Sequence, residues 1–135
     1  MFASVLPDFH YRPDLDVFTV RWLTHDATAT TPADYEALLR APEAPRTHRW
    51  LLDVRRRPYT DAAAAQWVVR SWLPRAAALV PAPLRLAYLI APTRAEELRT
   101  NTPLRAVVQP ATEPGHAYLL RTFTDEGEAV RWLLA

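Results

Sequence analysis

The most constraining feature of this sequence is that strand-like runs alternate with longer helix-like segments. Asp16–Leu23 (DVFTVRWL) alternates β-branched and aromatic residues with a period of two, which is typical of a strand. Trp50–Val54, Leu84–Ala91 and Ala117–Phe123 are further short runs, and the first two are apolar enough to lie inside a sheet. Strands that are separated by helices need crossover connections, which favour parallel pairing. The sequence therefore predicts an α/β fold with a mostly parallel sheet.

The N-terminal region adds an antiparallel hairpin to this plan. A shorter strand is expected around Phe9–Arg12, and Pro13–Asp14 supplies a turn before the strand at Asp16–Leu23. The hairpin should lie at an edge of the sheet, because Pro7 and Pro13 disturb the hydrogen bonding least there.

Capping residues, prolines and helical spacing place the helices. The helix after Asp61 repeats its apolar residues at helical spacing up to Leu79, and Pro74 should kink or divide it. Helices are expected to begin near Thr31, Asp61, Thr93, Pro103 and Asp125. The predicted order is β-β-α-β-α-β-α-β-α, in one domain of residues 1–135 with a single mixed, mostly parallel sheet flanked by helices.

Composition narrows the function classes. The formal net charge is +1, and all sixteen basic residues are arginine, so no large excess of charge favours nucleic acid or an anionic membrane. The chain has no cysteine, no pattern of a signal peptide and no apolar run of about 18 residues. We therefore expect a cytoplasmic protein that binds neither nucleic acid nor membrane.

Three local phrases resemble the SpoIIAA-like (STAS) superfamily, the fold of anti-sigma-factor antagonists. They are RWLLDVRRR (49–57), LRLAYLIAP (84–92) and FTDEGEAVRWLL (123–134). The resemblance is greatest to short, stand-alone, uncharacterised STAS-like proteins. It implies a SpoIIAA-like sheet and a non-catalytic, regulatory role in protein–protein interaction. In signalling members a serine that follows the strand aspartate is phosphorylated; Asp53 matches that aspartate, and Thr60 is the one aliphatic hydroxyl in the matching region.

Three consecutive arginines follow the central strand. In an open α/β sheet ligands bind beyond the carboxyl ends of the strands, and guanidinium groups suit carboxylates and phosphates. One interpretation is therefore a pocket for a small anionic ligand, and the other is a solvated strand end whose arginines pair with nearby aspartates. The candidate ligand-binding residues are Asp53, Arg55, Arg57, Tyr59, Thr60 and Arg94.

Catalytic and metal sites have little support in the sequence. The four histidines show no metal-ligand spacing, and two glycines and two serines provide neither a phosphate-binding loop nor a nucleophile elbow. Asp53 lies in an apolar strand and is interpreted as a structural hydrogen-bond acceptor for the 55–60 loop, with a general base as the alternative. We expect no catalytic residue, no metal and no cofactor.

The helix that follows Asp61 carries apolar residues on more than one face. Trp67 and Trp72, with Val68, Val69 and Leu73, exceed what one contact with a sheet can cover. Either this helix is buried on both sides, or Trp67 and Trp72 belong to an interface with a partner or a second copy. The leading hypothesis is thus a non-catalytic interaction domain that forms a homodimer or binds a partner. The alternatives are a binder of small anions and, more weakly, an enzyme with Asp53 as its base.

Overall fold

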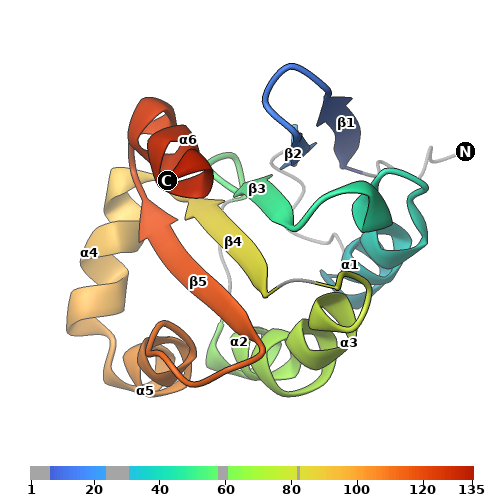
Figure 1. The fold of residues 1–135 in the computed structure, drawn as a ribbon. Coiled ribbons are helices and arrows are strands. Elements are labelled where there is room, and N and C mark those ends of the chain that lie inside the picture. The colour runs from blue at the N-terminus through green and yellow to red at the C-terminus, as the bar shows by residue number, and fades with distance from the viewer. Residues whose placement is uncertain (1–6, 24–30, 58–60, 82) are drawn as a thin grey trace, which may run out of the picture.

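The computed structural model describes residues 7–23, 31–57, 61–81 and 83–135, and it has five strands in one sheet in the order β1-β2-β3-β4-β5 (Figure 1). The hairpin β1–β2 is antiparallel, and every other neighbouring pair is parallel. The predicted α/β fold with a mixed sheet and an N-terminal hairpin is confirmed. The strands are β1 Asp8–Arg12, β2 Val17–Arg21, β3 Arg49–Asp53, β4 Leu84–Leu89 and β5 Tyr118–Phe123.

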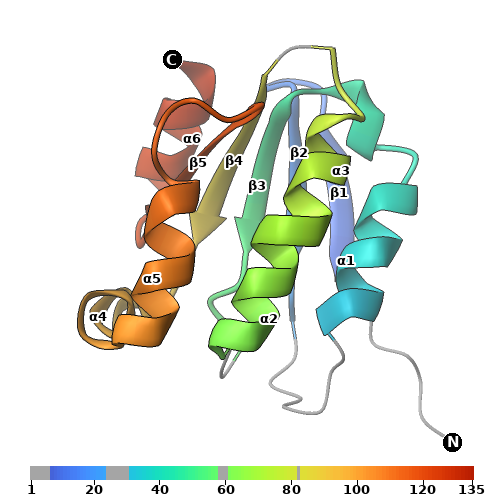
Figure 2. The same ribbon diagram turned by 90° about the horizontal axis from the view of Figure 1, so that it is seen from below.

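The helices cover the two faces of the sheet unequally (Figure 2). Strands β2 to β5 follow one another in sequence order, and crossovers of one hand then place all connecting helices on the same face. That face carries α1 (Thr31–Arg40), α2 (Ala62–Trp67), α3 (Leu73–Ala77) and α5 (Thr102–Ala111). The last helix, α6 (Glu126–Leu134), packs on the opposite face against β3 and β4, while α4 (Pro92–Thr100) packs against α5. A short 3₁₀ turn, η1, spans Ala44–Arg46.

Two apolar cores follow from this arrangement. The larger one lies under α1, α2, α3 and α5 and contains Phe18, Trp50 and Trp72. The smaller one joins Leu51 and Leu89 of the sheet to α6. Strands β3 and β4 contribute to both cores, so they are buried on both faces. This explains why their sequences are continuously apolar, as expected.

The helical segment after Asp61 is divided, as Pro74 led us to expect. A π-helical turn, η2 (Val68–Trp72), separates α2 from α3. Proline has no N–H to donate to the preceding turn, and a π-helical turn rearranges the hydrogen bonds around that gap. The segment contacts α5 on one side and α1 on the other.

Trp72 does not reach the surface, so the prediction that it belongs to an interface is wrong. Its exposed fraction is 0%, and its indole N–H donates to the backbone oxygen of Tyr35 at 2.9 Å. Trp67 is half-buried and packs edge-on against Tyr35. Neighbouring elements of the chain therefore cover Trp72 completely and Trp67 in part, and the place of Trp67 in an interface stays a prediction.

Two of the expected helix starts, at Asp125 and Thr93, had different outcomes. Asp125 caps α6 through a hydrogen bond from the backbone N–H of Glu128 at 2.9 Å. The helix expected to begin near Thr93 begins one residue earlier, at Pro92, and no side chain caps it. Proline suits the first helical position, so Thr93 lies inside the helix, and Glu96 pairs with Arg99 instead.

We expect Asp125→Ala to lower the free energy of unfolding by about 1 kcal/mol, since it removes the side-chain acceptor from the first turn of α6. Urea denaturation followed by circular dichroism measures the loss. Asp125→Asn, which keeps an acceptor oxygen, should recover most of it. Equal losses in the two variants would contradict the capping role.

Candidate ligand pocket

The three consecutive arginines after β3 point to different surroundings. Arg55 pairs with Asp53, whereas Arg57 pairs with Asp34 of α1. Arg56 is exposed, and its Nη1 lies 3.4 Å from the backbone oxygen of Leu23. The run therefore does not form one cluster, and only part of it can belong to any single site.

Arg55 belongs to a charged group on the α6 side of the sheet, which we call the rim cluster: Arg21, Asp53, Arg55 and Glu126. Arg21 donates to Asp53 Oδ2 at 2.8 Å and to both oxygens of Glu126 at 2.9 Å. Arg55 donates from Nε and Nη2 to the two oxygens of Asp53 at 3.0 and 2.9 Å. Two positive charges thus face two negative charges, and the cluster joins β2, β3 and α6.

Asp53 is a structural acceptor in this cluster. Its exposed fraction is 7%, and the backbone N–H of Arg55 also donates to it at 3.2 Å. Burial raises the pKa of Asp53, but the hydrogen bonds from Arg55 and Arg21 outweigh it, so the pKa lies below the ordinary value. A carboxylate with these donors and a lowered pKa is a poor general base.

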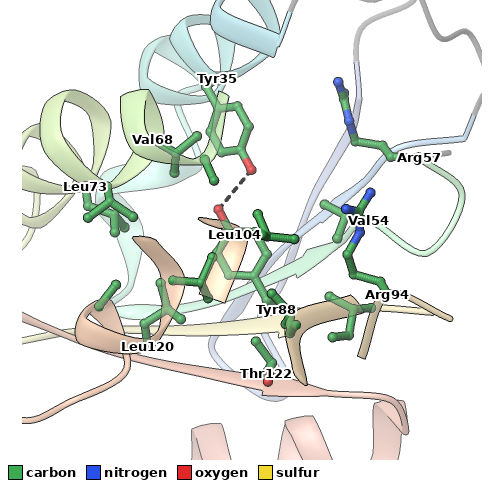
Figure 3. Close-up of a pocket in the computed structure, with 16 residues that line it drawn as sticks. Tyr35, Val54, Arg57, Val68, Leu73, Tyr88, Arg94, Leu104, Leu120 and Thr122 are labelled. Atoms are coloured by element: carbon green, nitrogen blue, oxygen red, sulfur yellow. Dashed lines mark hydrogen bonds between the residues drawn. The ribbon is translucent and has the colours of Figure 1, made fainter. Parts of the chain in front are cut away.

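A pocket opens on the other face of the sheet, between the α2–η2 segment and the α4–α5 pair (Figure 3). Its volume is about 120 Å³, and its floor is the carboxyl-terminal part of β4 and β5. This volume is below the roughly 300–1,000 Å³ of sites for drug-sized ligands and suits a smaller molecule. Most of the walls are apolar and include Val68, Leu73, Leu98, Leu104, Val108 and Leu120.

Arg57 lines this pocket in a fixed position. Its Nη1 donates to Asp34 Oδ2 at 2.9 Å, and the same oxygen accepts the indole N–H of Trp22 at 3.1 Å. The guanidinium also lies over the ring of Trp22, 5.6 Å from its centroid. Both charged side chains are at most 10% exposed, so the pair holds Arg57 in place before any ligand arrives.

Arg94 lines the same pocket from the first turn of α4. Its side chain is only 14% exposed, and its Nη1 lies 3.4 Å from Glu97 Oε2. Glu97 is 38% exposed, and a long pair with an exposed partner contributes little stability. Figure 3 draws Arg57 and Arg94 at the same end of the pocket, on either side of Val54.

Two tyrosine hydroxyls meet inside the pocket. Tyr35 comes from α1 and Tyr88 from β4, and their oxygens are 2.9 Å apart. Burial raises the pKa of Tyr35 to about 12 and raises the pKa of Tyr88 well above the ordinary value. Both phenols therefore stay protonated near neutral pH and act as neutral hydrogen-bonding groups.

The structure places four of the six candidate ligand-binding residues, and it divides these four between two sites. Asp53 and Arg55 lie in the rim cluster, and Arg57 and Arg94 line the pocket. Tyr59 and Thr60, including the possible phosphorylation of Thr60, lie outside the described residues. Sequence reasoning missed Tyr35 and Tyr88 as pocket residues. One signal was present, because Tyr88 shares the period-two face of Leu84 and Leu86, and a phenol on a core-facing position needs a polar partner.

Comparison with known proteins identifies no relative. No protein-family model, curated protein or solved structure matches the chain. Within the described ranges, no cluster of three or more potential metal-ligating side chains occurs, and no helix has the length and apolarity needed to cross a membrane.

Proposed function

We propose that this protein is a non-catalytic binder of a small anionic ligand with an apolar body. The observation that carries the proposal is an apolar pocket with two largely buried arginines at one end. Apolar walls favour an apolar body, because its burial removes hydrocarbon surface from water. The guanidinium groups favour a carboxylate or a similar anion.

The two arginines have different roles in this proposal. Arg57 is preorganised by Asp34 and Trp22, so the ligand does not have to order it. Arg94 exchanges its weak contact with Glu97 for the ligand anion, and Glu97 is exposed enough to turn into water.

Binding, rather than catalysis, fits the chemistry of the walls. The described residues that line the pocket include no carboxylate, histidine or serine. The carboxylate considered as a base, Asp53, does not line the pocket and is held by Arg21 and Arg55. The self-association hypothesis loses its main support, since Trp72 is internal.

We also propose that the chain is a small, stand-alone STAS-like protein. The sheet order β1-β2-β3-β4-β5 supports this, and so do the positions of the three resembling phrases at β3, β4 and α6. An experimental structure in which β5 does not pair parallel to β4 would remove the support. The binding proposal does not depend on this assignment.

The binding proposal is tested with benzoate, phenylacetate and 3-phenylpropanoate, which combine a carboxylate with an apolar body of increasing length. We expect at least one to bind in isothermal titration calorimetry and to raise the melting temperature. Arg94→Ala should weaken that binding about 10- to 100-fold, because it removes a charge-assisted hydrogen bond.

Arg131→Ala is the matched control, since Arg131 is an exposed arginine of α6, on the opposite face of the sheet from the pocket. It should leave the affinity unchanged. The proposal fails if none of the three acids binds, or if Arg94→Ala binds them as tightly as the wild type does.

A further inference from the structure

The two tyrosines of the pocket carry one hydrogen atom more than their mutual hydrogen bond uses. Each phenol has one O–H donor. In the contact of 2.9 Å between them, one hydroxyl donates and the other accepts. The accepting hydroxyl keeps its own hydrogen, and that hydrogen must find a second acceptor.

The surroundings of the pair make this requirement strict. Tyr35 is buried, and Tyr88 is half-buried beside apolar wall residues such as Val68, Leu104 and Leu120. No described side chain other than these two tyrosines is bonded to either hydroxyl. A ligand that covers the pair shuts water out, so an apolar group placed against it would leave that O–H donor buried without an acceptor, which is unfavourable.

From this geometry we infer that the ligand carries a second oxygen acceptor on its apolar body, which receives a hydrogen bond from the Tyr35–Tyr88 pair. The inference rests on the proposed function and defines the ligand class more narrowly. In this inference the anionic end binds at Arg57 and Arg94 and the second oxygen binds at the tyrosines. Figure 3 draws these two groups of side chains at different places along the pocket. Hydroxy- and oxo-substituted small carboxylic acids have this pattern.

The pattern also explains selectivity. A site that is built to bond a ligand oxygen discriminates strongly against the analogue that lacks it, because the protein donor is then left buried and unpaired. An apolar wall at the same place would accept both. The tyrosine pair is therefore the specificity-determining feature, and the arginines supply the general affinity for acids.

The test compares each acid above with its 4-hydroxy counterpart: 4-hydroxybenzoate, 4-hydroxyphenylacetate and 3-(4-hydroxyphenyl)propanoate. In the wild type, at least one hydroxylated acid should bind about tenfold tighter than its parent. The double variant Tyr35→Phe/Tyr88→Phe should lose this preference, because hydroxylated acids no longer gain a hydrogen bond and parent acids no longer leave a donor unpaired. Both rings remain, so the shape of the pocket is kept.

Tyr11→Phe is the matched control, because Tyr11 lies in β1 and bonds Asp16 outside the pocket. It should keep the tenfold preference. If parent acids bind through Arg94 but hydroxylated acids bind no tighter, the inference is wrong and the proposed function stands. If the double variant keeps the preference, the inference is also wrong. If no acid of either kind binds, the proposed function fails and the inference with it.

Discussion

Trp72→Ala should lower the free energy of unfolding by about 3–5 kcal/mol, the largest effect we expect from a single substitution in this chain. The indole is fully buried between the sheet and α1, with Tyr35 and Trp50 at ring-centroid distances of 4.7 and 6.2 Å. Its removal leaves a cavity and also removes the hydrogen bond from the indole N–H to the backbone oxygen of Tyr35. Urea denaturation followed by tryptophan fluorescence measures the loss.

Trp132→Ala is the matched control for this experiment. Trp132 is half-buried on α6, where it packs against Phe123 and under Arg85. Its loss should cost about 1–2 kcal/mol. The free energy of unfolding of a small domain is only about 5–15 kcal/mol, so Trp72→Ala can leave a partly unfolded protein. In that case Trp72→Phe, which keeps a smaller ring, gives a measurable and smaller loss of unfolding free energy. Similar losses for Trp72→Ala and Trp132→Ala would show that Trp72 is not the centre of the core.

Asp53→Ala should lower the free energy of unfolding by about 2–3 kcal/mol at neutral pH. The substitution leaves Arg21 and Arg55 facing each other without the carboxylate that both contact. Breaking a fully buried pair costs about 3–5 kcal/mol, but these two arginine side chains are 32% and 42% exposed and regain some hydration. Asp14→Ala, which removes the exposed pair with Arg12, should cost no more than about 1 kcal/mol.

The stabilisation by the rim cluster should disappear in acid. Hydrogen bonds from arginine hold the pKa of Glu126 below its ordinary value, and the net effect on the pKa of Asp53 has the same direction. A carboxylate whose pKa is lower in the folded state stabilises the fold fully above its unfolded pKa, about 4, and loses that contribution as the pH falls through the folded value.

The difference in unfolding free energy between wild type and Asp53→Ala should therefore be largest at about pH 7 and shrink below about pH 4. Urea titrations at several pH values measure it. A difference that stays constant or grows in acid would mean that the Asp53 carboxylate is not stabilised by its arginine partners in the folded state.

Much of the fold could be predicted because it follows from local patterns. The period of two in β2, the apolar runs of β3 and β4 and the capping aspartate of α6 are each properties of a few neighbouring residues. The order of these elements then limits the topology, since a strand and the next parallel strand need a crossover between them. The division of the helix at Pro74 was predictable for the same local reason.

The site was predictable only in part. The sequence brings Arg57 and Arg94 to one rim, because both follow the carboxyl ends of neighbouring parallel strands. It does not say that Arg55 turns to the α6 side while Arg57 turns to α1, two residues further along the same loop. Nor does it say that Trp72 packs inward, because an apolar helix face looks the same in a core and at an interface.

By itself, then, the sequence determined the alternation of strands and helices, the parallel sheet with its antiparallel edge, and the polar character of one rim. Only the tertiary structure decided which arginines pair with which carboxylates, and that Tyr35 and Tyr88, 53 positions apart, share one hydrogen bond inside a pocket. The physical reason is the distance along the chain over which each kind of interaction acts. Periodicity and capping act within one or two turns of chain, whereas a pocket is defined by side chains from distant elements whose relative rotation depends on how the whole core packs.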